Sequence, residues 1–271
     1  MSETRSSTAP LQGDPAGGYR YVVVKTRDIV LPFETAKDVF FPTHTSQLLI
    51  NGARRAITTP GKLLDLGCGI GVCGLVLATQ GLCRQPVYLS DLSERAMALV
   101  GANARALKID VVARQGSLFA PWAGETFDVI VDDVSGVAED VARFSSWFPA
   151  GVACHSGHDG TALVAQIIAE TPHHLNPGGV LLFPVLSLSC EHRILDVAHT
   201  VFEEVSLVTE QSWFLPEELL KHFDVLQPLL DTGVITLEHK FGAWLWSTKI
   251  YQARSPRPGA RPSVRGALRP S

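Results

Sequence analysis

The sequence lacks any long hydrophobic run: no apolar stretch approaches the roughly 18 residues that a helix needs to span a bilayer. Its first residues are polar and rich in Ser and Thr, without the apolar segment of a secretory signal. The five cysteines are scattered and form no Cys-x-x-Cys pair, which disfavours a zinc site and a disulfide framework. We therefore expect a cytoplasmic protein with reduced thiols and no membrane partner.

An excess of positive charge is also missing. The 271 residues include 23 Lys and Arg and 27 Asp and Glu, which gives a formal net charge of −4. The chain has no overall positive charge that would attract phosphates, so nucleic acid is not expected as a partner. A hydrophobic content of 46% and a charged content of 18% are typical of one sizeable globular domain with an appendage. Composition leaves the oligomeric state open.

Composition and patterning divide the chain into four parts. Residues 1–18 are rich in Ser, Thr, Pro and Gly and are predicted to form a flexible tail. Residues 19–60 are predicted to be an appendage that shapes the entrance to a binding site. Residues 61–252 form the main domain, and residues 253–271 are a tail rich in Pro and Arg that is expected to be disordered.

Strand-like and helix-like segments alternate in the main domain, as in a parallel sheet with helices on both faces. A helix is also expected over residues 47–56, with Ser46 as its N-cap. The last strand alternates apolar and polar residues and is predicted to be an antiparallel strand at the edge. The predicted fold is therefore α/β, a Rossmann-like seven-stranded sheet with a small N-terminal appendage. Strands are expected near 62–66, 87–90, 110–114, 127–131, 180–185, 205–209 and 244–251, and helices near 70–79, 93–107, 159–175, 189–202 and 216–230.

A glycine loop follows the first strand of the main domain, within residues 62–74 (KLLDLGCGIGVCG). The leucines before it suit a short buried strand. Gly67, Gly69 and Gly71 allow the backbone to turn sharply and to approach a ligand that side chains would block. The amides at the start of the following helix would then point at that ligand.

Two nucleotide cofactors fit this loop. Asp91 ends the next strand about 20 residues on, where an acid binds ribose hydroxyls in either cofactor family. Gly69, Gly71 and Gly74 satisfy the G-x-G-x-x-G pattern of NAD-binding folds, so a dehydrogenase is one alternative. Asp65, two residues before the first glycine, and the glycine spacing favour S-adenosylmethionine (SAM).

Candidate ligand-binding residues follow the strands, because ligands of such sheets bind at the carboxyl ends of the strands. Ser117 or a neighbouring amide can hydrogen-bond adenine, and Leu118 can cover its face. The loop after the fourth strand would face the reactive methyl group. The candidates by loop are residues 67–71, then Asp91 and Leu92, then Ser117 and Leu118, and finally Asp132 and Asp133.

Several motifs together resemble the glutamine-amide methyltransferases that modify peptide release factors, within the wider group of small-domain class I methyltransferases. The resemblance covers about residues 40–250 and implies SAM as cofactor and S-adenosylhomocysteine (SAH) as product. It rests on F-x-P-x-x-x-S at residues 40–46, on LLDLGCGIG, QGSLFAP and FDVIV, and on residues 156–183. By position it implies Pro42 and Ser46 at the cofactor entrance, Asp65, Gly67, Gly69 and Gly71 by the methionine moiety, Asp91 on the ribose, and Ser117 and Leu118 near adenine.

The catalytic loop differs from the family pattern. The family has Asn-Pro-Pro-Tyr where this chain has Asp-Val-Ser-Gly at residues 133–136. A carboxylate at Asp133 can orient an N–H nucleophile and accept its proton, whereas an oxygen nucleophile needs a base nearer neutral pKa. His155 and His158 are the candidates for such a base. Asp132 and Asp133 can also be considered as Mg²⁺ ligands, but no third spaced ligand accompanies them, and no metal is predicted.

These observations predict a SAM-dependent methyltransferase that acts on a nitrogen or oxygen of a small molecule or peptide. One alternative keeps the enzyme class and methylates a protein glutamine, as in release factors, or an amide nitrogen of nucleic acid. Another is a SAM-binding regulatory or scaffold protein without catalytic activity.

Overall fold

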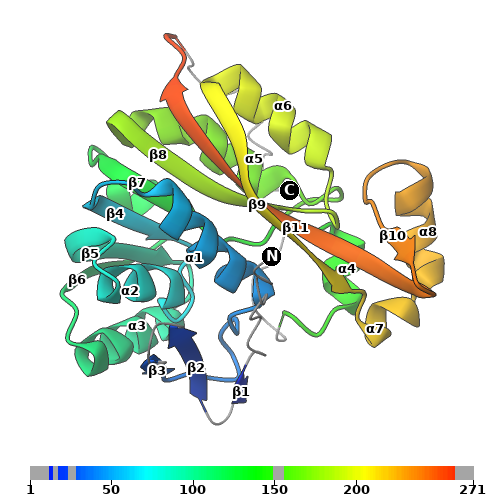
Figure 1. Ribbon diagram of the computed structural model, residues 1–271, viewed down its shortest axis with the longest axis horizontal. Helices are drawn as coiled ribbons and strands as arrows, with labels where there is room; N and C mark the ends of the chain where they lie inside the picture. Colours follow the sequence, from blue (N-terminus) through cyan, green and yellow to red (C-terminus); the bar gives the residue numbers. More distant parts are fainter. Residues whose placement is uncertain (1–11, 15–17, 24–28, 149–155, 260–271) are drawn as a thin grey trace, which may run out of the picture.

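The computed structural model describes residues 12–14, 18–23, 29–148 and 156–259, and its centre is an eight-stranded sheet (Figure 1). Five parallel strands form one half in the order β8-β7-β4-β5-β6. The predicted α/β class is confirmed. The strands are β4 (Gly61–Leu66), β5 (Cys83–Asp91), β6 (Val111–Gln115), β7 (Phe127–Asp132), β8 (Leu175–Leu186), β9 (Phe202–Phe214), β10 (Glu238–Lys240) and β11 (Ala243–Pro256).

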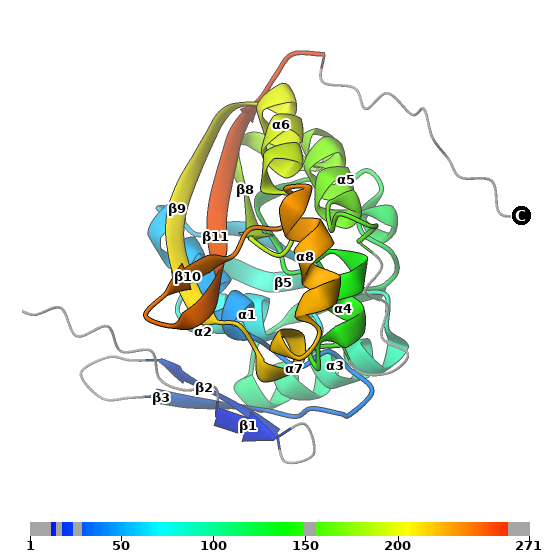
Figure 2. The same ribbon diagram turned by 90° about the vertical axis from the view of Figure 1, so that its right-hand side faces the viewer.

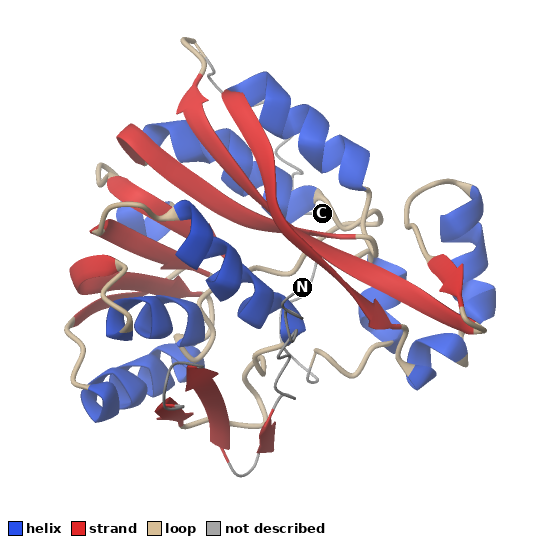
Figure 3. Cartoon of the chain, viewed as in Figure 1, coloured by secondary structure: helices blue, strands red, loops and turns tan. Residues whose placement is uncertain are grey.

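The prediction that the last strand lies at the edge is wrong. Strand β11 lies between β8 and β9 and is antiparallel to both, so β9 becomes an outer strand (Figure 3). The short β10 pairs with the start of β11 and adds an eighth strand that the sequence did not indicate. Alternation of apolar and polar residues shows that a segment is a strand, but it carries no information about which strands are its neighbours.

Successive strand residues face opposite sides of the sheet, and each side has its own core. Leu63 and Val129 pack with helices of the first side, whereas their neighbours Leu64 and Ile130 pack with helices of the second side. Because both faces are covered, the parallel strands are apolar almost throughout. The first side carries α1 (His44–Ala56), α2 (Val72–Thr79) and α3 (Glu94–Leu107), and the second carries α5 (Ala162–Glu170) and α6 (Glu191–Val201). Figure 2 shows α5 and α6 beside one face of β8, β9 and β11.

A third apolar cluster joins the end of the sheet to the helices α4 (Glu139–Phe144), α7 (Glu217–Leu220) and α8 (Phe223–Asp231). Helix α4 was not predicted, and the single helix expected over 216–230 is two short ones. The helix expected to reach residue 175 ends at Glu170, where a 3₁₀ turn that contains Pro172 follows. A proline has no N–H for the helix ladder and limits how far a helix can continue.

The appendage contains a three-stranded antiparallel sheet of β1 (Gln12–Asp14), β2 (Gly18–Val23) and β3 (Ile29–Phe33). Strand β1 thus falls within the range expected to be a flexible tail, whose other residues before Gly18 lie outside the described part. At the other end, β11 continues to Pro256, past the domain boundary expected at residue 252. The basic tail from residue 260 lies outside the described residues.

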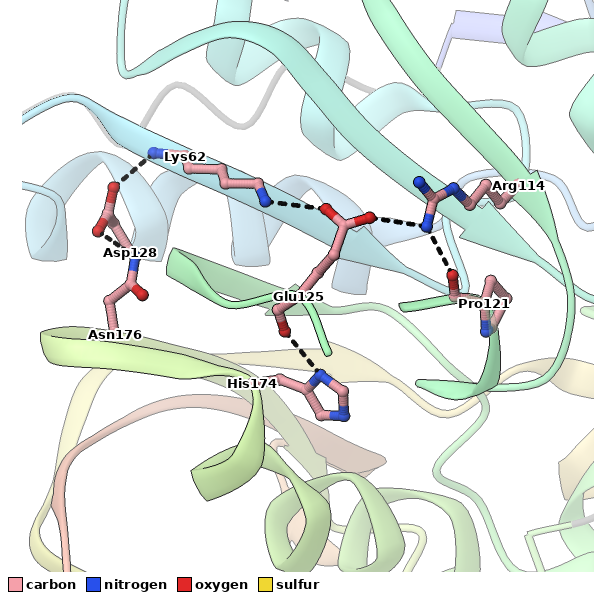
Figure 4. A network of polar contacts seen from close by, with 7 residues as sticks. All are labelled: Lys62, Arg114, Pro121, Glu125, Asp128, His174 and Asn176. Atoms are coloured by element: carbon pink, nitrogen blue, oxygen red, sulfur yellow. Dashed lines mark hydrogen bonds and ion pairs between the residues drawn. The ribbon is translucent and has the colours of Figure 1, made fainter. Parts of the chain in front are cut away.

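A polar network closes the amino ends of the parallel strands (Figure 4). Glu125 accepts from Lys62 Nζ at 2.9 Å and from Arg114 at 2.8 Å. Asp128 accepts from the Lys62 amide at 2.7 Å and from Asn176 Nδ2 at 2.8 Å. Because these polar groups are paired with one another, this edge of the sheet has a structural role. The candidate site lies at the opposite edge.

Asn103 connects α3 to the segment that precedes α1. Its side chain is 1% exposed; Nδ2 donates to Ile70 O at 3.0 Å and to Glu34 O at 3.2 Å, and Oδ1 accepts from Glu34 N at 2.6 Å. We expect Asn103→Ala to lower the free energy of unfolding by about 2–3 kcal/mol, because buried backbone groups lose their partners. Urea denaturation measures this, with exposed Asn51→Ala as the control. Equal effects of the two substitutions would contradict the role of Asn103.

Candidate functional site

A cavity of about 540 Å³ lies at the carboxyl ends of β4, β5, β6 and β7. Parallel strands end at the same edge, which is why loops that are far apart in the sequence meet there. The structure brings seven of the predicted site residues to the cavity wall. They are Gly67, Gly69, Asp91, Leu92, Ser117, Leu118 and Asp133.

Five other predicted residues do not line the cavity. Asp65 and Asp132 are fully buried behind its wall, and Gly71 precedes α2. Pro42 and Ser46 flank the wall at the start of α1. The remaining two are the histidines proposed as bases, His158 and His155.

The structure does not bring His158 to the cavity. It is exposed within a tight turn in which Gly160 N donates to Gly157 O at 3.1 Å, so the turn presents His158 to solvent. His158 therefore has no structural basis for the role of base. His155 lies outside the described residues.

The glycine loop forms a cradle in the wall. Gly67 has φ +63°, and a Cβ there would lie 2.5 Å from Val134 Cγ1. Gly69 has φ +51°, and a Cβ there would approach only Phe40 O, at 3.7 Å. Both backbone conformations favour glycine. Gly69 borders the cavity and has no side chain, so a ligand can occupy the space that a side chain would otherwise fill.

Asp91 holds this cradle to the start of α3. Its Oδ2 accepts from Gly69 N at 2.9 Å, and its Oδ1 accepts from Ser93 N at 2.9 Å. A carboxylate oxygen has more than one acceptor position. Asp91 can therefore keep both backbone contacts and still accept hydrogen bonds from ligand hydroxyls in the cavity.

Two buried acids support the loops from behind. Asp65 Oδ2 accepts from Gly74 N at 2.7 Å, and Asp132 Oδ1 accepts from Val134 N at 2.9 Å. Among the described residues, Asp65 Oδ1 and Asp132 Oδ2 have no hydrogen-bond partner. Burial raises the pKa of Asp65 well above its usual range and that of Asp132 to about 8. The Asp132 carboxyl therefore favours the neutral form near pH 7.

The raised pKa of Asp132 makes a prediction about stability. A carboxyl whose pKa is higher in the folded state than in the unfolded state stabilises the fold at low pH. This contribution to the free energy of unfolding is lost as pH rises from about 4 through about 8. Asparagine does not titrate, so we expect Asp132→Asn to gain stability relative to the wild type as pH increases. Between pH 5 and pH 8, the difference in free energy of unfolding should shift by on the order of 2 kcal/mol in favour of the variant. Urea denaturation at both pH values measures the difference. Exposed Asp110→Asn is the control, and a constant gap between Asp132→Asn and wild type would contradict the assignment.

Asp133 is one of three acids that line the cavity, with Asp38 and Asp91. It is part-buried, accepts a hydrogen bond from the Ser46 side chain, and its Oδ2 lies 3.6 Å from Cys73 Sγ. Burial raises the pKa of Asp133 to about 7, against the lowering effect of these hydrogen bonds. A carboxyl with such a pKa can exchange a proton near neutral pH, which suits a general base.

The start of α1 contributes residues that the sequence reading missed. Thr43 is the N-cap: its Oγ1 accepts from Thr45 N at 3.2 Å, and Ser46 Oγ accepts from Thr43 N at 3.3 Å. The predicted N-cap at Ser46 is therefore wrong, because Ser46 is the third helical residue of a capping box. His44 and Thr45 thereby line the cavity. The Thr-x-x-Ser spacing was the signal that could have indicated this start.

An aromatic wall, Phe40, Trp147, Phe148 and Trp246, also lines the cavity. The ring centroids of Phe40 and Phe148 are 5.6 Å apart, and those of Trp147 and Trp246 are 5.0 Å apart. The loop of residues 133–136 supplies no aromatic residue, but three distant segments do. Trp246 is 6% exposed and belongs to the third apolar cluster, and it also borders the cavity.

The wall fits SAM better than a dinucleotide. The Gly69 cradle, the Asp91 carboxylate and the apolar Leu92 and Leu118 suit a sulfonium nucleoside, whose sugar offers two hydroxyls. A pyrophosphate would be repelled by Asp91, since no lysine or arginine of the described chain lines the cavity. The same part of the chain holds no group of three or more His, Cys, Asp or Glu placed to bind a metal. None of its helices is long and apolar enough to cross a membrane.

Comparison with solved structures identifies the class of fold. The chain resembles the ribosomal protein L11 methylase from Lactobacillus delbrueckii subsp. bulgaricus, with a TM-score of 0.53, 19% identity, and coverage of 87% of this chain and 90% of that one. It also resembles the Thermus thermophilus 16S rRNA N2 G1207 methyltransferase solved with AdoMet and guanosine, with a TM-score of 0.54, 13% identity, and coverage of 88% and 50%. The fold is that of the class I methyltransferases.

Comparison of sequences shows which methyltransferases the chain resembles. Residues 33–133 match the family model described as Methyltransferase small domain. The chain is 29% identical over 160 residues to the release factor glutamine methyltransferase of Geobacter sulfurreducens, which covers 56% of this chain and 55% of the relative. It is 33% identical over 159 residues to that of Vibrio cholerae, with coverage of 56% and 55%. The chain thus spans just over half the length of these relatives, and the predicted resemblance is confirmed.

Proposed function

We propose that this protein transfers the methyl group of SAM to a nitrogen atom. The observation that carries the proposal is one cavity that joins the Gly69 cradle and Asp91 to the Asp133 carboxyl. The cradle and Asp91 would hold the methionine and ribose parts of the cofactor, and Leu92, Ser117 and Leu118 would contact the adenine. SAM supplies an electrophilic methyl group on a positively charged sulfur.

Asp133 would orient the acceptor and take its proton. A carboxylate accepts hydrogen bonds from N–H groups, so it fixes where the nitrogen lone pair points. Methyl transfer requires close approach and alignment, and such positioning can supply several kcal/mol of the barrier. Ser46 and Cys73 contact Asp133 from α1 and α2 and so restrain its side chain.

Two classes of acceptor are supported by different observations. The relatives are named release factor glutamine methyltransferases, and a further relative in Bradyrhizobium diazoefficiens is named ribosomal protein uL3 glutamine methyltransferase, which favours a protein amide nitrogen. That relative is 31% identical over 130 residues, which is 46% of this chain and 40% of the relative. The Asp-Val-Ser-Gly loop and the aromatic wall instead favour a small-molecule nitrogen.

The experiment has two stages. Calorimetry first measures SAH binding to the purified protein, and absence of binding would overturn the proposal. Transfer of labelled methyl from SAM is then measured on release factor, on ribosomal protein uL3 and on the small-molecule fraction of a cell extract. Labelling supports the proposed activity and assigns the acceptor class. SAH binding without labelling of any of them would support the regulatory alternative.

A further inference from the structure

The charge on the cavity wall has one sign. The described residues that line the cavity include the acids Asp38, Asp91 and Asp133 but no lysine or arginine. His44 is the one histidine among them, and burial against Trp213, whose ring centroid lies 4.3 Å away, accompanies a lowered pKa of its imidazole. Burial thus favours the neutral imidazole of His44, and the charged side chains on the described cavity wall are acids.

This charge disfavours an acceptor that carries phosphate. Proteins bind nucleic acids chiefly through Lys and Arg contacts to phosphate oxygens. A nucleotide or RNA acceptor would instead meet carboxylates, and bringing like charges together costs free energy. A neutral or positively charged acceptor faces no such penalty, and a cation gains from the carboxylates.

The remaining wall is apolar and rich in rings. Trp147, Phe148 and Trp246 line the cavity together with Leu163 and Leu186. Indole and phenyl faces bind flat apolar groups by stacking and attract cations through their negative faces. Rings and carboxylates in one cavity suit a ligand that has a flat apolar body and a basic nitrogen.

Resting on the proposed methyl transfer, we propose that the acceptor is an amine with an aromatic body, whose ring packs on Trp147 and Phe148 and whose nitrogen lies at Asp133. The Asp133 carboxylate accepts one proton from the ammonium form, which leaves a lone pair on nitrogen. That pair forms the new N–CH₃ bond while the S–CH₃ bond breaks. The electrons of the broken bond stay on sulfur, so SAH leaves neutral at sulfur and the nitrogen carries the charge.

Binding to the SAH-loaded protein tests the inference, with tryptamine as the probe. Tryptophol has the same indole with a hydroxyl in place of the amine, adenosine monophosphate carries a phosphate, and a glutamine-containing peptide represents the protein amide. We expect tryptamine to bind at least about tenfold more tightly than each of the three, from its charge and its ring together. It should also accept labelled methyl from SAM. Tighter binding of any of the other three, or no tryptamine binding, would overturn the inference.

Variants of the aromatic wall separate a binding role from a structural one. Trp147→Ala and Phe148→Ala should each weaken tryptamine binding about tenfold while SAH affinity stays within about twofold. Both residues are part-buried, so the substitutions spare the deep core. Phe144→Ala, which removes a part-buried ring stacked on His222 outside the cavity, should leave both affinities unchanged. Equal losses for Phe144→Ala would overturn the assignment.

The two proposals fail in different ways. Absence of SAH binding would overturn the methyl-transfer function and this inference with it. SAH binding and methyl transfer to a glutamine peptide, without tryptamine binding, would overturn only the identity of the acceptor.

Discussion

Asp133→Asn is expected to lower kcat by about 100-fold or more, the effect typical of losing a general base. Asparagine keeps the size of the side chain and one oxygen acceptor but cannot take a proton near pH 7. The SAH affinity should change by less than about threefold, because the cradle and Asp91 are untouched. Steady-state kinetics on the methylated acceptor and calorimetry with SAH measure the two quantities.

The pH profile distinguishes a base from a merely structural acid. Because the carboxylate is the active form, kcat of the wild type should rise with pH and level off above about 7. In Asp133→Asn this rise should disappear. Exposed Asp110→Asn, at the other edge of the sheet, should keep the wild-type profile. If Asp133→Asn retained both kcat and the rise, another group would have to be the base.

Asp91→Ala is expected to weaken SAH binding by about 100-fold. The substitution removes the acceptor for ligand hydroxyls and also frees the Gly69 and Ser93 amides that now donate to Asp91. Hydrogen bonds to a charged group contribute about 1.5–3 kcal/mol each, and 1.4 kcal/mol corresponds to about tenfold in affinity. Calorimetry with SAH measures the loss directly.

A second variant separates loss of the ligand contact from collapse of the loop. Asp91→Asn keeps one oxygen for Gly69 or Ser93, so the loop should persist while binding still weakens by about tenfold. Asp110→Ala is the matched control and should leave affinity unchanged. Wild-type affinity in both Asp91 variants would mean that the cofactor does not lie against this carboxylate.

Local chemistry explains what could be predicted. The glycine loop and Asp91 were predicted from spacing alone, because the backbone conformations at Gly67 and Gly69 depend on the residue type itself. The alternation of strands and helices gave the fold class for a similar reason: each segment must bury an apolar face. These features need no knowledge of distant parts of the chain.

Features that depend on pairing of distant segments could not be predicted in this way. The alternating pattern of β11 indicates a strand equally well at the edge or between β8 and β9. The helix start at Thr43 was missed because the apolar periodicity becomes clear only after Ser46. His158 was proposed as a base from its place in the loop at the start of the helix expected over 159–175, and its turn places it in solvent.

The sequence by itself determined the α/β class, the glycine loop and the acid that follows the second parallel strand, since steric and hydrogen-bonding preferences of single residues set them. Only the tertiary structure decided which groups line the cavity together. Phe40, Trp147 and Trp246 come from segments separated by about a hundred residues each, and their meeting depends on sheet order and helix packing. The raised pKa of Asp133 is likewise a product of packing, because burial of its carboxyl causes it.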